Sequence, residues 1–187
     1  MTVTAPAQRA AWMLAAAASA ILLIAGCGPF PGQSSGSGGG ADKAIPTSFT
    51  DARHRYSITA PGPMTSKPDG SASFSHENER LDVVLVEGAA AADPAALADK
   101  EASSLRSSTS GFRLVSRPGA ESIGGKQMVK FTYASTVSRG GGSLTVMTAR
   151  YYIPKDDKLL AVVTYSDDSA EFDSSEADGI MTTFRWL

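Results

Sequence analysis

Cysteine and histidine are scarce in this sequence, and their scarcity excludes several kinds of site. The single cysteine, Cys27, allows no intramolecular disulfide. The two histidines, His54 and His76, have no second histidine at helical or hairpin spacing, so neither belongs to a zinc motif. Lysine and arginine number 17 against 19 acidic residues, and they form no basic cluster that would bind nucleic acid. We therefore predict no metal, no cofactor and no nucleic-acid partner.

Charge is almost absent from the N-terminal part of the chain. Arg9 is the only charged residue among the first 41, and an uncharged apolar run follows it from residue 10 to residue 26. A bilayer-spanning helix needs about 20 apolar residues, whereas this run is shorter and much of it is alanine, which is only weakly apolar. The pattern predicts a secretory signal peptide over residues 1–26. An uncleaved membrane anchor with an incidental cysteine is the alternative.

The apolar run ends in Ile24-Ala25-Gly26-Cys27, a branched aliphatic residue and two small ones before the cysteine. This motif resembles the lipobox of bacterial lipoproteins. The resemblance implies transfer of a diacylglyceryl group to the Cys27 sulfur and signal cleavage between Gly26 and Cys27. In such lipoproteins the new amino group is usually acylated as well, with palmitate an expected acyl chain, and the sequence leaves this second acylation open for Cys27. Two or more acyl chains anchor a protein stably, so we expect lipid anchoring at the extracytoplasmic face of the cell membrane.

Glycine, serine and proline dominate residues 28–40, which cannot bury enough apolar surface to fold. We predict that residues 27–44 hold the lipidated cysteine and a flexible tether. Residues 45–187 then remain for one folded domain, a length that suits a single hydrophobic core. Residues 32–36 match the G-x-S-x-G nucleophile motif, but the low-complexity surroundings offer no strand or helix, so we attribute the match to chance.

Apolar periodicity predicts strands and two helices in this domain. The strands are expected over residues 56–59, 72–76, 81–87, 113–115, 121–123, 128–137, 144–153 and 159–165. One helix begins after Asp93-Pro94 and extends to residue 107, and a second spans residues 169–184. The apolar stretch 81–87 is expected to be covered on both faces, and the last three strands to form an antiparallel meander. Strands, helix, meander and helix in this order correspond to the α+β class.

Several of these segments together resemble a known family. The resemblance rests on Tyr56-Ser57-Ile58-Thr59-Ala60-Pro61, the helix after Asp93-Pro94, the hairpin Ile123-Gly124-Gly125-Lys126, the meander, and the ending Met181-Thr182-Thr183-Phe184. Over residues 45–187 the chain resembles the PsbP/Mog1-like domain of actinobacterial lipoproteins of the LpqN/LpqT kind. The resemblance implies an α/β/α sandwich, with a central antiparallel sheet flanked by helices. It also implies a non-enzymatic binding or accessory role.

No residue pattern in the domain predicts a catalytic site. His54, between two arginines, and His76, beside three polar residues, are each interpreted as surface histidines. Residues 119–127 resemble a phosphate-binding loop, but their spacing is too long and a hairpin turn explains them. The carboxylates between residues 167 and 178 do not follow calcium-loop spacing and are assigned to a helix N-terminus. Four aromatic residues are assigned to the core rather than to a partner-binding patch: Tyr133, Tyr151, Tyr152 and Trp186.

These observations predict a lipid-anchored envelope protein that acts by binding an envelope protein partner rather than by catalysis. Two alternatives remain open. A lipid or glycan carrier would need a lined apolar cavity of at least about 300 Å³ between sheet and helix. A hydrolase would need a serine, an aspartate and His54 or His76 within hydrogen-bond reach of one another.

Overall fold

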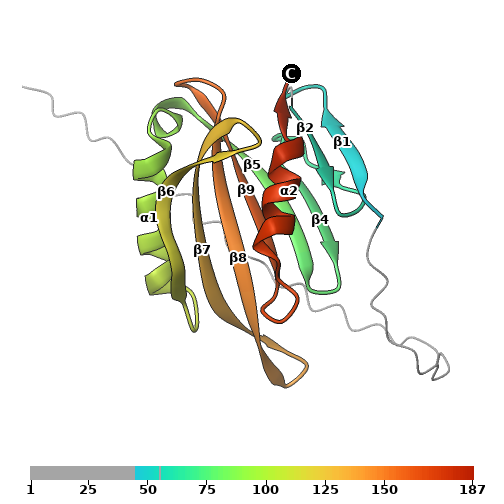
Figure 1. Ribbon diagram of the computed structural model, residues 1–187, viewed down its shortest axis with the longest axis vertical. Coiled ribbons are helices and arrows are strands. Elements are labelled where there is room, and N and C mark those ends of the chain that lie inside the picture. The colour runs from blue at the N-terminus through green and yellow to red at the C-terminus, as the bar shows by residue number, and fades with distance from the viewer. Residues whose placement is uncertain (1–44, 55) are drawn as a thin grey trace, which may run out of the picture. The chain divides into compact units, whose positions relative to one another are not determined.

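A seven-stranded antiparallel sheet organises the computed structural model, which describes residues 45–54 and 56–187 (Figure 1). The strand order is β3-β4-β5-β9-β8-β7-β6, so β7, β8 and β9 form the predicted meander. The strands of this sheet are β3 (Thr65–Ser66), β4 (Ala72–His76), β5 (Glu79–Glu87), β6 (Arg113–Ile123), β7 (Lys126–Arg139), β8 (Gly142–Pro154) and β9 (Leu159–Asp168).

A smaller sheet of three strands joins the two ends of the domain. It contains β1 (Thr47–Asp51), β2 (Tyr56–Ala60) and β10 (Arg185–Trp186), in the order β1-β2-β10. Both neighbours pair antiparallel with β2, and Tyr56 is opposite Asp51 on one side and Trp186 on the other. The last residues of the chain therefore hold the first strands in place.

Two helices and one short 3-10 helix complete the domain. The helix α1 (Pro94–Ser108) begins with proline in its first turn, and the Asp93 side chain caps it by accepting from the Ala96 amide at 2.9 Å. The helix α2 (Ser174–Thr183) is capped in the same way by Asp173, which accepts from the Ser175 amide at 2.7 Å. The 3-10 helix η1 (Gly88–Ala91) lies between β5 and α1.

The large sheet has a separate hydrophobic core on each face because successive side chains of a strand point in opposite directions. On β8, Tyr151 and Ile153 point toward α2 and the small sheet, whereas Tyr152 points toward α1 and η1. Figure 1 shows α2 on the near face of the sheet and α1 behind β6. Each face is thus closed by one helix, and the face that carries α2 is closed by the small sheet as well.

The α+β class, the first helix and the meander agree with the sequence-based expectation. The expected α/β/α sandwich is matched only in part, because a three-stranded sheet shares one outer layer with α2. Strand β1 was not predicted from the sequence, although its alternation of half-buried and exposed residues is regular.

Three local predictions are wrong. The two short strands expected around Pro118-Gly119 are one strand, β6, which accommodates these residues by shifting register along β7. The second helix begins at Ser174 rather than at residue 169, because β9 continues through Asp168. The stretch 81–87 is not covered on both faces, since Val84 remains 47% exposed.

The predicted signal peptide, the cleavage position at Gly26, the lipidation site at Cys27 and the tether lie outside the described residues. Within the described part of the chain, neither helix has the length and apolar character that crossing a membrane requires.

Candidate functional site

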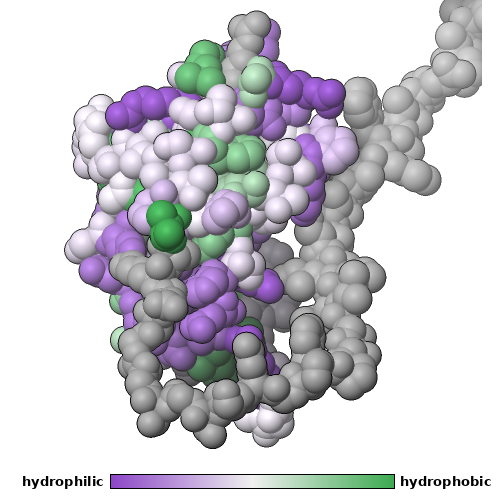
Figure 2. All heavy atoms as spheres, turned by 90° about the vertical axis from the view of Figure 1, so that its right-hand side faces the viewer, coloured by the Kyte–Doolittle hydropathy of each residue, from purple (hydrophilic) through white to green (hydrophobic). Residues whose placement is uncertain are grey.

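An open cleft of about 530 Å³ lies where the turn after β1 faces β3 and the turn that follows it. The lining is mostly polar, and it combines residues from two separate chain segments. These residues are Phe49, Thr50, Asp51, Ala52, Arg53, His54, Ser66, Lys67 and Pro68. Figure 2, which views the molecule from the β1 side, shows hydrophilic and hydrophobic residues interspersed on the coloured part of this face.

Asp51 and His54 form a pair at the edge of this cleft. One oxygen of Asp51, Oδ1, accepts a hydrogen bond from the His54 backbone amide at 2.8 Å and lies 3.1 Å from the ring Nδ1. Burial raises the pKa of Asp51, but the hydrogen bonds from His54 outweigh it and hold that pKa below its usual value. The carboxylate is therefore ionised at neutral pH, and it orients the imidazole so that Nε2 is the nitrogen left for other contacts.

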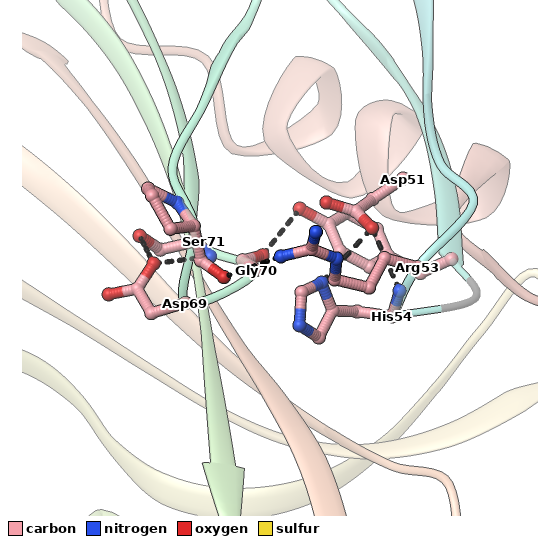
Figure 3. A network of polar contacts seen from close by, with 8 residues as sticks. Asp51, Arg53, His54, Asp69, Gly70 and Ser71 are labelled. Atoms are coloured by element: carbon pink, nitrogen blue, oxygen red, sulfur yellow. Dashed lines mark hydrogen bonds and ion pairs between the residues drawn. The ribbon is translucent and has the colours of Figure 1, made fainter.

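Gly70, on the turn that follows β3, packs directly against the His54 ring beside the cleft. It has a φ of +80°, and a Cβ built on it would lie 2.5 Å from two atoms of the imidazole. The turn from Lys67 to Ser71 is closed by two backbone hydrogen bonds, of 2.8 and 3.1 Å. Figure 3 shows the residues of the β1 turn facing Asp69, Gly70 and Ser71. Only glycine combines this backbone conformation with this close approach.

Tyr56 connects the cleft to the hydrophobic core. Its ring is fully buried and stacks on Phe184 at 5.7 Å between centroids, while its hydroxyl donates to the Gly70 carbonyl at 3.1 Å. Burial, together with the negative charges of Asp51 and Asp69, raises the pKa of Tyr56 far above its usual range. The tyrosine therefore stays protonated, and its hydroxyl fixes Gly70 to the strand that follows the Asp51–His54 turn.

Asp69 is the second acidic residue beside the cleft, and Ser71 engages it. Asp69 Oδ1 accepts from the Ser71 hydroxyl at 2.6 Å and from the Ser71 amide at 3.0 Å. These two hydrogen bonds lower the pKa of Asp69. Both carboxylates near the cleft thus use one oxygen to organise their own turn.

The arrangement offers cationic groups and a positioned imidazole to a molecule in solvent. Arg53 and Lys67 are exposed, and His54 is partly buried with its Nε2 uncommitted. Ser66 lines the same cleft, but among the described residues no hydrogen bond joins a serine hydroxyl to either histidine. The cleft is open and polar, unlike the enclosed apolar cavity that a lipid carrier would need.

His54 is partly exposed and lines the open cleft, which fits the predicted surface position, but its side chain also pairs with Asp51 and packs on Gly70, contacts that the sequence did not reveal. His76 is exposed at the end of β4, as the sequence predicted. Two sequence signals could have marked the site. Asp51 precedes His54 by three residues, a spacing that suits a turn, and Pro68-Asp69-Gly70 is a turn with a glycine in its left-handed position.

The other motifs have structural roles. The segment that resembled a phosphate loop is the β6–β7 hairpin, whose Gly124 and Gly125 both have positive φ, as the sequence predicted. Tyr133, Tyr151 and Tyr152 are buried, which confirms their assignment to the core. The described residues contain no group of three or more histidine, cysteine, aspartate or glutamate side chains that could hold a metal ion.

One buried cation lies elsewhere, between the sheet and α2. Lys130 is only 6% exposed, and its Nζ lies 2.7 Å from Asp178 Oδ1 and 3.3 Å from the Ser174 hydroxyl. The Tyr151 hydroxyl donates to the same Asp178 oxygen at 2.8 Å. This network fixes α2 on the sheet, and its groups satisfy one another, so it is interpreted as structural.

Comparison with known proteins adds a likeness of fold. No protein-family model matches the sequence, and no curated protein matches it. Among solved structures, a protein of Bacteroides thetaiotaomicron superposes with a TM-score of 0.50 over 75% of this chain at 11% identity. The match spans about half of that protein, 48% of its length. At this identity the similarity supports a shared fold and says nothing about activity.

Two further solved structures superpose less closely. PA94 of Pseudomonas aeruginosa, a protein of unknown function described as a putative regulator, has a TM-score of 0.46 at 15% identity and covers 74% of this chain and 94% of its own. LpqN of Mycobacterium tuberculosis, described as involved in cell envelope biogenesis, has a TM-score of 0.36 at 16% identity, covering 76% and 80%. Neither superposes well enough to add to the likeness of fold.

Proposed function

We propose that this protein is a lipoprotein of the cell envelope whose folded domain acts by binding, not by catalysis. Cys27 is its lipidation site, residues 28–44 space the domain from the membrane, and the Asp51–His54 cleft meets the partner. The observation that carries the proposal is the sequence Ile24-Ala25-Gly26-Cys27 at the end of an uncharged run, followed at once by a glycine- and serine-rich spacer. On this proposal the protein belongs with the actinobacterial lipoproteins that its sequence resembles.

The structure supports a binding role through the cleft. Backbone hydrogen bonds close the turn from Lys67 to Ser71, and the buried Tyr56 holds the Gly70 carbonyl of that turn, so the cleft is formed before a partner binds. A preformed site loses less conformational entropy on binding than one that must be ordered. Its charged groups face solvent, where a component of the envelope can reach them.

Lipid anchoring is tested by replacing Cys27 with alanine in the full chain and separating membranes from soluble material. We expect the wild-type protein in the membrane fraction with acyl chains attached, and the C27A variant without acyl chains and released after signal processing. A C27A variant that remains in the membrane fraction like the wild type would contradict the anchoring proposal.

The binding role is tested by photocrosslinking in intact cells. A photoreactive residue at the exposed Thr50, within the cleft, should capture a specific envelope component. The same residue at Asp99, on the exposed side of α1, serves as the matched control. Equal products from the two positions would show that the cleft is not the contact surface.

A hydrolase is the second candidate, and the Asp51–His54 pair is the observation that favours it. An imidazole oriented by a carboxylate can act as a general base toward a hydroxyl, and Ser66 lines the same cleft. No hydrogen bond joins Ser66 to His54 among the described residues, so a hydrolase would need substrate binding to bring the two side chains together. The test is labelling with a fluorophosphonate, which reacts with activated serines. Under the binding proposal neither the wild type nor the H54A variant is labelled, whereas labelling that H54A abolishes would establish the hydrolase.

A further inference from the structure

The cations of the cleft are unusually free of partners. The Arg53 guanidinium makes one long hydrogen bond, 3.5 Å to the Pro68 carbonyl. Within the described part of the chain, the Lys67 ammonium takes part in no hydrogen bond and no ion pair. An exposed cation that already pairs with a carboxylate binds an anionic ligand weakly. The hydrogen-bond donors of Arg53 and Lys67 are available to such a ligand.

Neither acidic group near the cleft forms an ion pair with these cations in the described part of the chain. Asp51 Oδ1 is used by His54, and Asp69 Oδ1 is used by Ser71. The residues that line the cleft include two cationic side chains, Arg53 and Lys67, and one carboxylate, Asp51. The residues that line the cleft therefore carry one positive charge more than negative ones, while the Asp69 carboxylate beside the cleft also acts electrostatically on Lys67.

The donors also have a particular arrangement. Arg53 and His54 come from the turn after β1, and Lys67 comes from the turn after β3, so the cleft presents cationic groups from two sides. A carboxylate has two oxygens, which one arginine can satisfy with its bidentate fork. A terminal phosphoryl group has three free oxygens, so it can accept from arginine, lysine and imidazole together.

We propose that this cleft binds a terminal phosphoryl group, with Arg53 and Lys67 as its main contacts and His54 Nε2 as a third. The proposal rests on the binding role proposed above and specifies the chemistry of the ligand. The opening of the cleft to solvent admits the end of a larger molecule, such as the phosphomonoester headgroup of phosphatidic acid, as readily as a free phosphate compound. The two sources share the same recognition chemistry.

Isothermal titration of the purified full chain tests this inference with three probes. Inorganic pyrophosphate represents a free phosphate compound, a short-chain phosphatidic acid represents a headgroup, and acetate represents a carboxylate. We expect saturable binding of at least one phosphoryl probe, at least about tenfold tighter than acetate, since charged hydrogen bonds are lost with the third oxygen. Preference for phosphatidic acid would identify a headgroup as the source, and preference for pyrophosphate a free phosphate compound.

Two double variants make the test specific. R53A/K67A removes both cations of the cleft and should weaken phosphoryl binding at least about tenfold. K100A/K158A removes the same charge from two exposed positions, on α1 and in the β8–β9 turn, and should leave the affinity within about twofold. Because all four side chains are exposed, each variant should unfold at the same temperature as the wild type to within a few degrees.

Equal weakening in the two double variants would show non-specific charge attraction and overturn the proposal. Absence of saturable binding by either phosphoryl probe would overturn it as well. Failure of phosphoryl binding while Thr50 still crosslinks specifically in cells would reject the ligand class and leave the binding role standing. Failure of both would reject the cleft as a binding site.

Discussion

Replacing Gly70 by alanine should destabilise the domain through two separable effects. The first is the backbone conformation, because a φ of +80° costs an alanine about 1–2 kcal/mol relative to glycine. The second is the clash of the new Cβ with the His54 ring, which lies 2.5 Å from where that atom would be. Displacing a packed side chain typically costs about 1–3 kcal/mol. The expected total is a loss of about 2–5 kcal/mol in the free energy of unfolding.

Gly125 provides a matched control for the backbone effect. Its φ is +77°, nearly that of Gly70, but a Cβ on Gly125 would have no neighbour within 4 Å. The G125A variant should therefore lose only the backbone contribution, about 1–2 kcal/mol. Removing the ring in the double variant H54A/G70A should bring the cost of the alanine at position 70 down to the same level. The difference measures the contact between His54 and Gly70.

Urea denaturation followed by circular dichroism measures these free energies, provided that the slope of the transition is the same in all variants. A G70A variant that loses no more stability than G125A would refute the close approach of Gly70 and His54. The same conclusion would follow if H54A did not reduce the cost of G70A. In either case Gly70 would not pack on His54 as described.

Three further predictions concern charged and phenolic groups. D178A should lower the free energy of unfolding by about 2–3 kcal/mol, because it leaves the buried Lys130 ammonium without its carboxylate partner at 2.7 Å. K130M should lower it by only about 1 kcal/mol, since Asp178 is partly exposed and keeps its hydrogen bond from Tyr151. Urea denaturation of both variants measures the two losses. Hydrogen bonds lower the pKa of Asp51 in the folded state, so the ionised carboxylate stabilises the domain fully above about pH 4. This stabilisation is lost as the pH falls through the folded-state pKa of Asp51. The wild type should therefore be more stable than D51N at neutral pH and lose that difference in acid, as urea denaturation at several pH values would measure. Burial raises the pKa of four tyrosines, Tyr56, Tyr151, Tyr152 and Tyr165. The stability of the domain should therefore fall above about pH 10, and the ultraviolet signal of tyrosine ionisation should appear together with unfolding. Ionisation of these tyrosines before unfolding would contradict their burial.

The sequence predicted best those elements whose signals are local. The alternation along β7 assigns Val129 and Phe131 to one face and Lys130 to the other, as found, because a strand has a side-chain period of two. Asp93-Pro94 correctly marked the start of α1, since capping involves only neighbouring residues. Glu101 falls within the apolar arc of this helix because it meets Arg150 and Tyr152, and no local pattern reveals those partners.

The errors arise where tertiary structure overrides a local signal. Pro118 and Gly119 normally interrupt a strand, but β6 is at the edge of its sheet, where a missing amide and a bulge are tolerated. Asp167 and Asp168 look like the acidic start of a helix, yet both belong to β9. Val84 is exposed because the helix on that face covers other strands, which the composition of β5 cannot show.

The candidate site was the least predictable feature. Asp51 and His54 are close in sequence, but Gly70, which packs on His54, belongs to a separate turn, and Tyr56 holds Gly70 from a third position. A cleft formed by two separate turns has no sequence period, and its residues are individually ordinary. Only the pairing of β1 with β2, and the return of the chain at Lys67, bring them together.

The binding of a ligand in this cleft is tested most directly by amide spectra of the isotope-labelled full chain during titration with pyrophosphate. The account predicts saturable shifts at Arg53, His54 and Lys67, with the amides of Lys100 and Lys158 unchanged. Shifts that fail to saturate, or that occur at exposed lysines throughout the domain, would contradict the assignment of the Asp51–His54 cleft as the binding site.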